Sequence, residues 1–135
     1  MAAKLDKKRK EYNANTHAEF IEKAYHVEVK HLRHAVWTKP DGTDVWMVRM
    51  DGLVRDDWRN TRRDNDNIIV EEYVGKDSIQ LKKNESVCPI RVAVCILDYH
   101  CGTGRIYTIL GTYELDLNES DIKRCRVWRK VSDDK

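Results

Sequence analysis

The sequence lacks the long apolar segments that mark membrane and secreted proteins. Its 135 residues contain no apolar run of about eighteen residues, the length that a membrane-spanning helix needs. Basic residues occur near the N-terminus, but no apolar segment follows them, so they do not form a secretory signal. We therefore expect an intracellular protein that has no membrane partner.

The cysteines and histidines also lack the spacing of a metal site. No C-x2-C pair, the spacing typical of zinc sites, occurs among Cys88, Cys95, Cys101 and Cys125. Three histidines, His26, His31 and His34, are close in sequence, but on a strand His31 and His34 would face opposite sides. We expect free thiols, surface histidines, and neither a metal nor another cofactor.

The net charge is small, so charge alone does not indicate a nucleic-acid partner. Lys and Arg number 25 against 23 Asp and Glu, a net charge of +2. Charged residues make up 36% of the chain and apolar residues 41%, which favours one domain with a modest core. Residues 1–15 are rich in lysine, and we interpret them as a basic, flexible arm before a single domain at 16–135.

One stretch, 86–116, has the pattern of a core. Two apolar, β-branched runs, 90–97 and 106–115, flank a glycine-bearing turn at 101–104. Neither run has helical spacing, and Pro89 suits the first position of a strand, where no ladder donor is lost. The stretch therefore predicts a central β-hairpin that the rest of the chain must cover or extend.

The flanking segments predict one helix and further strands. Thr16 and Glu19 have the spacing of a capping box, and apolar residues then recur at helical spacing to about residue 26. Pro40-Asp41-Gly42 predicts a turn between strands at 32–38 and 43–50. Two more strands are expected at 68–74 and 124–131, and a turn or brief helix at 118–121.

Residues 51–67 are the least core-like segment, and we expect a long polar loop there. The segment mixes four arginines with aspartates around a single Trp58. Polar loops of this length in a small domain are more often functional or disordered than idle. Two interpretations stay open, a solvated loop with self-paired charges and a recognition loop whose arginines contact phosphate.

The second half of the chain resembles the SRA (YDG) domain, a PUA-like module that reads modified cytosine in DNA. Its motif of an N-x-x-L element before P-[VI]-R-V is similar to residues 77–81 and 89–92. Its Y-D-G-x-Y strand and V-W-R/K strand resemble 107–113 and 127–129, which are followed by two aspartates. The resemblance rests on the order of these pieces.

Upstream, two more pieces are similar to the family in order and type. The sequence at 51–57, DGLVRDD, resembles the loop of the family's pocket, and Tyr73-Val74-Gly75 resembles the strand that ends it. The first pocket tyrosine of the family falls near Leu53, so Trp58 is the candidate for the missing ring. The Y-D-G triplet reads Ile109-Leu110-Gly111 and lacks its aspartate.

The resemblance implies an α+β fold, a PUA-like twisted, partly closed β-barrel with one or two flanking helices. It also implies a partner, double-stranded DNA that carries 5-methylcytosine or 5-hydroxymethylcytosine flipped into a pocket. Tyr73 would stack on the base, and Asp56 or Asp57 would accept a hydrogen bond from its amino group. The expected contacts to the nucleic-acid backbone come from Arg55, Arg59, Arg62, Arg63, Arg91 and Arg105.

Two other classes of function compete with this one. A metal-dependent nuclease needs an acidic residue and a lysine two apart on one strand, whereas Glu72 and Lys76 are four apart. We therefore expect no enzyme. The alternative is a small phage- or host-defence-related protein-binding module, because four tryptophans with many arginines also match the composition of protein interfaces.

Overall fold

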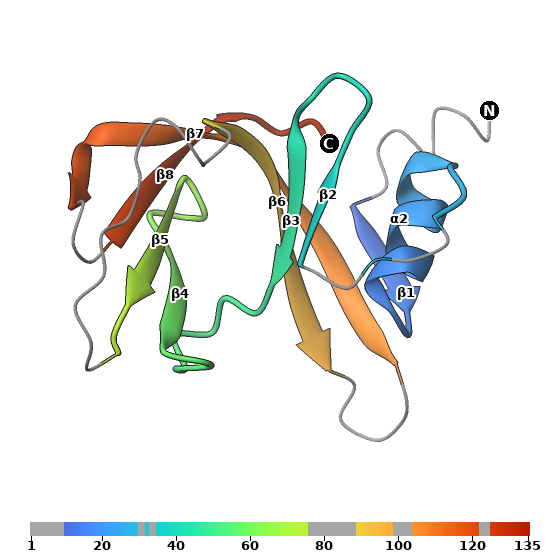
Figure 1. Cartoon of the computed structure of the whole chain (residues 1–135), viewed down its shortest axis with the longest axis horizontal. Coiled ribbons are helices and arrows are strands. Elements are labelled where there is room, and N and C mark those ends of the chain that lie inside the picture. Colours follow the sequence, from blue (N-terminus) through green and yellow to red (C-terminus); the bar gives the residue numbers. More distant parts are fainter. Residues whose placement is uncertain (1–9, 30–31, 33–34, 76–88, 99–103, 122–124) are drawn as a thin grey trace.

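The computed structural model describes residues 10–29, 32, 35–75, 89–98, 104–121 and 125–135. In sequence order, the elements are β1 (Glu11–Ala14), α2 (His17–Tyr25), β2 (Val36–Thr38), β3 (Asp44–Val48), β4 (Trp58–Arg63), β5 (Ile68–Tyr73), β6 (Ile90–Asp98), β7 (Arg105–Asp121) and β8 (Cys125–Ser132). The strands form one eight-stranded sheet in the order β2-β3-β6-β7-β8-β5-β4, and β1 pairs with β7 (Figure 1). Within the described residues, α2 is the one helix.

The sheet confirms the α+β class, and it is open rather than a closed barrel. Its end strands, β2 and β4, pair with β3 and β5 and not with each other. The charged side chains Arg59, Arg62 and Arg63 on β4 explain this, since charges are typical of an edge strand that forms no further pairing. Closure would bury these charges.

The predicted central hairpin is confirmed as β6 and β7, and β7 is longer than expected. Its first half lies between β6 and β1, and its second half pairs with β8. Shifts in register at Thr112/Tyr113 and after Asp116 let this long strand bend between two halves of the sheet. The turn or helix expected at 118–121 is instead the irregular end of β7, where Asp116 Oδ1 accepts from the backbone N–H of Asn118.

The predicted helix is confirmed, and its ends follow the expected chemistry. The Thr16 hydroxyl caps the first turn by accepting from the backbone N–H of Glu19 at 3.1 Å. His26 ends the helix in the left-handed conformation, with a φ of 56°. Strand β1 comes directly before the helix, so residues 11–14 belong to the sheet rather than to the flexible arm expected at 1–15. Residues 1–9 of that arm lie outside the described residues.

Two hairpins flank the centre, one expected and one not. The turn at Pro40-Asp41-Gly42 is confirmed, with Asp41 Oδ1 accepting from the Thr43 N–H at 2.9 Å and Gly42 at a φ of 91°. The polar segment 51–67 is not one long loop, because its second half forms β4 and a tight turn into β5. Positive φ angles at Asp64, Asn65 and Asp66 make that turn, and these residue types tolerate such angles.

The sheet separates two hydrophobic clusters. Helix α2 covers the first cluster, where Phe20, Ile21 and Ala24 are buried against β1, β3, β6 and β7. The second cluster lies on the other side and contains Trp46 and Trp128. These clusters hold most of the apolar side chains of the described residues, so the core is small, as the composition predicts.

Arg91 lies inside the second cluster. Its guanidinium carbon is 4.0 Å from the centroid of the Trp128 ring and 4.7 Å from that of Trp46, and the residue is only 6% exposed. Its NH1 is 3.8 Å from Glu71 Oε1, which also accepts from Arg126 NH1 and Trp128 Nε1 at 3.3 Å each. Arg91 therefore stabilises the core and is not exposed to contact phosphate, which corrects that expectation.

The described residues include Cys95 and Cys125 and, of the three clustered histidines, His26. Cys95 is buried and free, and Cys125 is half-buried and free. His26 is exposed. Cys88, Cys101, His31 and His34 lie outside the described residues.

Replacing Gly111 by alanine is expected to destabilise the protein by about 3 kcal/mol. Gly111 has a φ of +136°, and a Cβ there would lie 2.4 Å from the backbone oxygen of Ser132 on β8. Gly42→Ala is the control, because Gly42 also has a positive φ but has open space around it. It should cost only about 1 kcal/mol. Urea unfolding measures both changes, and equal effects would contradict a steric role for Gly111.

Replacing Arg91 by methionine is expected to lower the unfolding free energy by about 3 kcal/mol, because the buried Glu71 carboxylate loses a cationic partner. The matched control is Arg129→Met, which breaks the ion pair between Arg129, half-exposed on β8, and Asp116. The control should cost less than about 1 kcal/mol. Chemical denaturation of both variants measures the difference, and a destabilisation by Arg91→Met as small as that of the control would show that the buried cluster is not needed.

Candidate functional site

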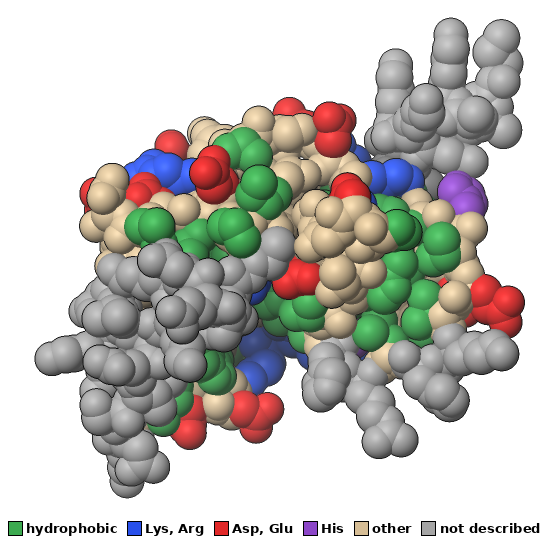
Figure 2. Space-filling model, turned by 45° about the horizontal axis from the view of Figure 1, so that its top comes forward, with side chains coloured by type: hydrophobic (Ala, Val, Ile, Leu, Met, Phe, Trp, Pro, Cys, Tyr) green, Lys and Arg blue, Asp and Glu red, His purple; other side chains and the backbone are tan. Residues whose placement is uncertain are grey.

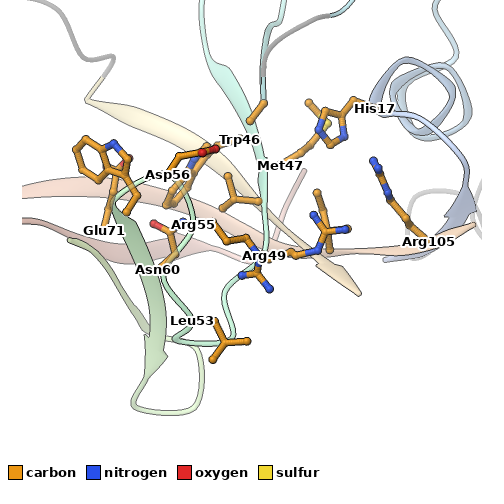
Figure 3. A pocket seen from close by; sticks show the side chains of 14 residues that line it. His17, Trp46, Met47, Arg49, Leu53, Arg55, Asp56, Asn60, Glu71 and Arg105 are labelled. Carbon is orange, nitrogen blue, oxygen red and sulfur yellow. The ribbon is translucent and has the colours of Figure 1, made fainter. Parts of the chain in front are cut away.

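A pocket of about 450 Å³ opens between the two halves of the sheet. Its walls come from β3, the segment after it, β4, β5, β6, the start of β7 and the start of α2. Figure 3 shows Asp56, Asn60 and Glu71 on one side of it, and His17 and Arg105 on the other. Its volume is within the range of small-molecule sites, about 300–1,000 Å³.

Acidic and basic side chains are mixed on the face of the molecule that Figure 2 presents. Blue basic and red acidic side chains are interspersed over it, with basic side chains also low in its centre. This distribution agrees with the small net charge of the chain.

The segment between β3 and β4 forms one wall and is held by its own side chains. The Asp51 carboxylate accepts two hydrogen bonds from the Arg55 guanidinium, at 2.8 and 2.7 Å, and one from the backbone N–H of Leu53. The bonds from Arg55 hold the pKa of Asp51 well below its usual range. Arg55 and Trp58 exchange backbone hydrogen bonds, which closes a tight turn before β4. Leu53, Arg55 and Asp56 therefore line a fixed wall.

Trp58 supplies an aromatic surface beside this wall of the pocket. It is half-buried, lines the pocket, and packs against Tyr73 with ring centroids 5.4 Å apart and an interplanar angle of 66°. The two residues are direct partners in the antiparallel pairing of β4 with β5, which brings their side chains together on one face. Tyr73 is buried behind Trp58 and fixes its ring.

Asn60 and Glu71 are the next pair along the same face. They are also direct register partners, and both line the pocket. The Asn60 Oδ1 atom is buried and has no hydrogen-bond partner among the described residues. The three contacts made by Glu71 all use its Oε1 atom. Asn60 Oδ1 is therefore an acceptor that the fold leaves unsatisfied, and Glu71 Oε2 makes no hydrogen bond among the described residues.

The opposite end of the pocket is basic and is anchored on Tyr107. The Tyr107 hydroxyl lies 2.8 Å from His17 Nδ1 and accepts from Arg105 NH1 at 3.3 Å. Burial lowers the pKa of His17, and the charges of Arg105 and Arg49 lower it further. His17, Arg49 and Arg105 all line the pocket.

The predicted pocket residues divide into two groups. Asp56 and Trp58 line the pocket, whereas Asp57 and Tyr73 do not. The sequence reasoning missed Asn60, Glu71 and Trp46, which line it. The missed signal was the turn-forming run 64–67 between two strands, because it sets the register that pairs Asn60 with Glu71.

The arginines expected at the nucleic-acid backbone also lie in different surroundings. Arg59 donates to Glu72 Oε1 at 3.0 and 2.7 Å, and Arg62 pairs with Asp66 at 3.6 Å. Arg62 and Arg63 are exposed on the edge strand β4. Arg55 and Arg105 line the pocket.

No grouping of metal-ligating side chains occurs among the described residues. In the same part of the chain, no helix has the length and apolar character needed to cross a membrane.

Comparison with solved structures gives a likeness of fold. No protein-family model matches the sequence, and no curated protein sequence matches it significantly. Among solved structures, the fold is similar to that of the 5-hydroxymethylcytosine-specific restriction enzyme AbaSI, with a TM-score of 0.63 and 20% sequence identity. The match covers 81% of this chain but 35% of that enzyme's chain. The chain therefore shares the fold found in part of a restriction enzyme specific for a modified cytosine.

Proposed function

We propose that this domain binds double-stranded DNA that carries 5-hydroxymethylcytosine or 5-methylcytosine, flips that base into the pocket, and does not itself cut the DNA. The observation that supports this most is the pairing of Asn60 with Glu71, which both line the pocket. The likeness to a 5-hydroxymethylcytosine-specific enzyme supports the choice of base.

The hydrogen-bonding groups at this end are complementary to cytosine. The amino group of cytosine has two hydrogens, and its ring nitrogen N3 is an acceptor. Asn60 Oδ1 and Glu71 Oε2 are two acceptors for the amino group, and the Asn60 amide nitrogen is a donor for N3. Thymine has an oxygen in place of the amino group, which the Glu71 carboxylate would repel. The pair therefore favours cytosine over thymine.

Trp58 is the candidate for stacking on the flipped base. Extrusion of a base costs a few kcal/mol, and stacking on an aromatic ring returns about 1–3 kcal/mol. Because Tyr73 packs against Trp58, the ring is held in place before the base arrives. In this arrangement, Tyr73 supports the stacking residue, and Trp58 fills the role that the family resemblance gives to a tyrosine. Asp56, on the same wall, is a further acceptor near the base.

The unaltered protein is expected to bind a duplex with 5-hydroxymethylcytosine about tenfold more tightly than the same duplex with cytosine, a difference of about 1.4 kcal/mol. Asn60→Ala should weaken binding to both duplexes by a similar factor, because the amino group and N3 that Asn60 would contact are the same in the two bases. It should leave the unfolding free energy unchanged or higher, because it removes a buried acceptor that has no partner in the fold. Competition titrations at two salt concentrations, with urea unfolding of each variant, measure both effects.

The matched control for this experiment is Thr61→Ala, the next residue on β4, which does not line the pocket. It should keep the affinity of the unaltered protein for both duplexes. Equal binding of all duplexes by the unaltered protein would contradict base recognition. Absence of binding at low salt would point to a protein partner instead.

Replacing both Arg62 and Arg63 by glutamate is expected to weaken binding to every duplex by a similar factor. Both residues are exposed on the edge strand β4, where they can reach phosphates. The slope of the logarithm of affinity against the logarithm of salt concentration should become shallower by about 0.9 for each phosphate that an arginine no longer neutralises. Lys23→Glu, on the exposed side of α2, is the control. Titration over a series of salt concentrations gives the slopes. An unchanged slope in the double variant would show that Arg62 and Arg63 do not contact the phosphates of the DNA.

A further inference from the structure

We propose that the end of the pocket formed by His17, Arg49 and Arg105 binds a phosphate group of the DNA backbone beside the modified cytosine. This inference rests on the proposed function, because it takes the ligand to be a nucleotide within DNA. It adds a site for the backbone to the site for the base, within one pocket.

Arg105 is the central residue of this site. It is half-buried at the start of β7 and lines the pocket. Among the side chains that the structure describes, none brings a carboxylate within ion-pair distance of it, and its one hydrogen bond there, from NH1, goes to the neutral Tyr107 hydroxyl. Among the described side chains, none occupies the other N–H groups of its planar fork, and this geometry matches two oxygens of a phosphate.

The arginine is held in place by a rigid support. Tyr107 is fully buried, and its ring is stacked on Phe20, with centroids 4.7 Å apart and the planes within 9° of parallel. Its hydroxyl contacts both Arg105 and His17, so one fixed atom positions two groups of the site. Little conformational freedom remains for Arg105 to lose when an anion binds, which favours binding.

The electrostatics at this end favour an anion. Burial lowers the pKa of the His17 ring, and Arg105 and Arg49 lie close enough for their positive charges to lower it further. The carboxyl groups of Asp56 and Glu71 lie on the other side of the pocket (Figure 3). A nucleotide is complementary to this arrangement, with the donors of a cytosine edge at one end and an anionic phosphate at the other. The pocket is therefore divided as its proposed ligand is.

The test combines a protein variant with a change in the DNA. Arg105→Gln should weaken binding to a duplex with 5-hydroxymethylcytosine about tenfold, the usual effect of removing a hydrogen bond to a charged group. A neutral methylphosphonate, placed at each phosphate flanking the modified base in turn, should weaken binding of the unaltered protein by a similar factor at one position. At that position, Arg105→Gln should cause no further weakening, because both changes remove the same interaction.

The controls separate this site from a structural role and from the base site. Arg129→Gln, at an exposed arginine paired with Asp116, should bind like the unaltered protein. Arg105→Lys should recover part of the affinity, and Arg105→Gln should keep the preference for the modified base. A weakening by Arg105→Gln that is equally large on every methylphosphonate duplex, or no weakening at all, would overturn the phosphate site. Failure of the proposed function would appear separately, as equal binding of modified and unmodified DNA by the unaltered protein.

Discussion

The carboxylate of Glu71 joins the core to the pocket, and the rest of the structure depends on its compensation. A buried carboxylate is costly unless cations and hydrogen-bond donors surround it. Arg91, Arg126 and Trp128 supply these groups, all at Oε1, and Arg91 is itself held between two tryptophan rings. The same contacts that allow Glu71 to be buried leave its second oxygen available to the pocket. The second cluster and the recognition that we propose at the pocket therefore share one side chain.

The two ends of the pocket come from different parts of the sheet, and β7 connects them. The acceptor end belongs to the β4–β5 hairpin, which reaches β7 through β8. The basic end belongs to the start of β7 and to α2, which packs on the first cluster. Because β7 bends at its irregular pairs with β8, residues from both halves of the sheet line one pocket.

The candidate site was only partly predictable from the sequence. Trp58 and Asp56 were identified from composition and family resemblance, and both line the pocket. Asn60 was missed because the segment 51–67 was interpreted as a loop, and a loop has no register that would pair it with Glu71 on the strand expected at 68–74. Arg91 was assigned to the nucleic-acid backbone from the family resemblance, but two tryptophans and a carboxylate make its burial favourable. Those partners are distant in sequence.

The sequence by itself determined the local features: the capped helix at Thr16, the turn at Asp41 and Gly42, and the central hairpin. Each depends on side chains within a few residues of one another, so composition and spacing suffice to predict it. Only the tertiary structure decided that the sheet stays open, that residues 58–63 form an edge strand, and that Asn60, Glu71, His17 and Arg105 share one pocket. These outcomes depend on pairing between strands far apart in the chain, where burial and register outweigh local preference.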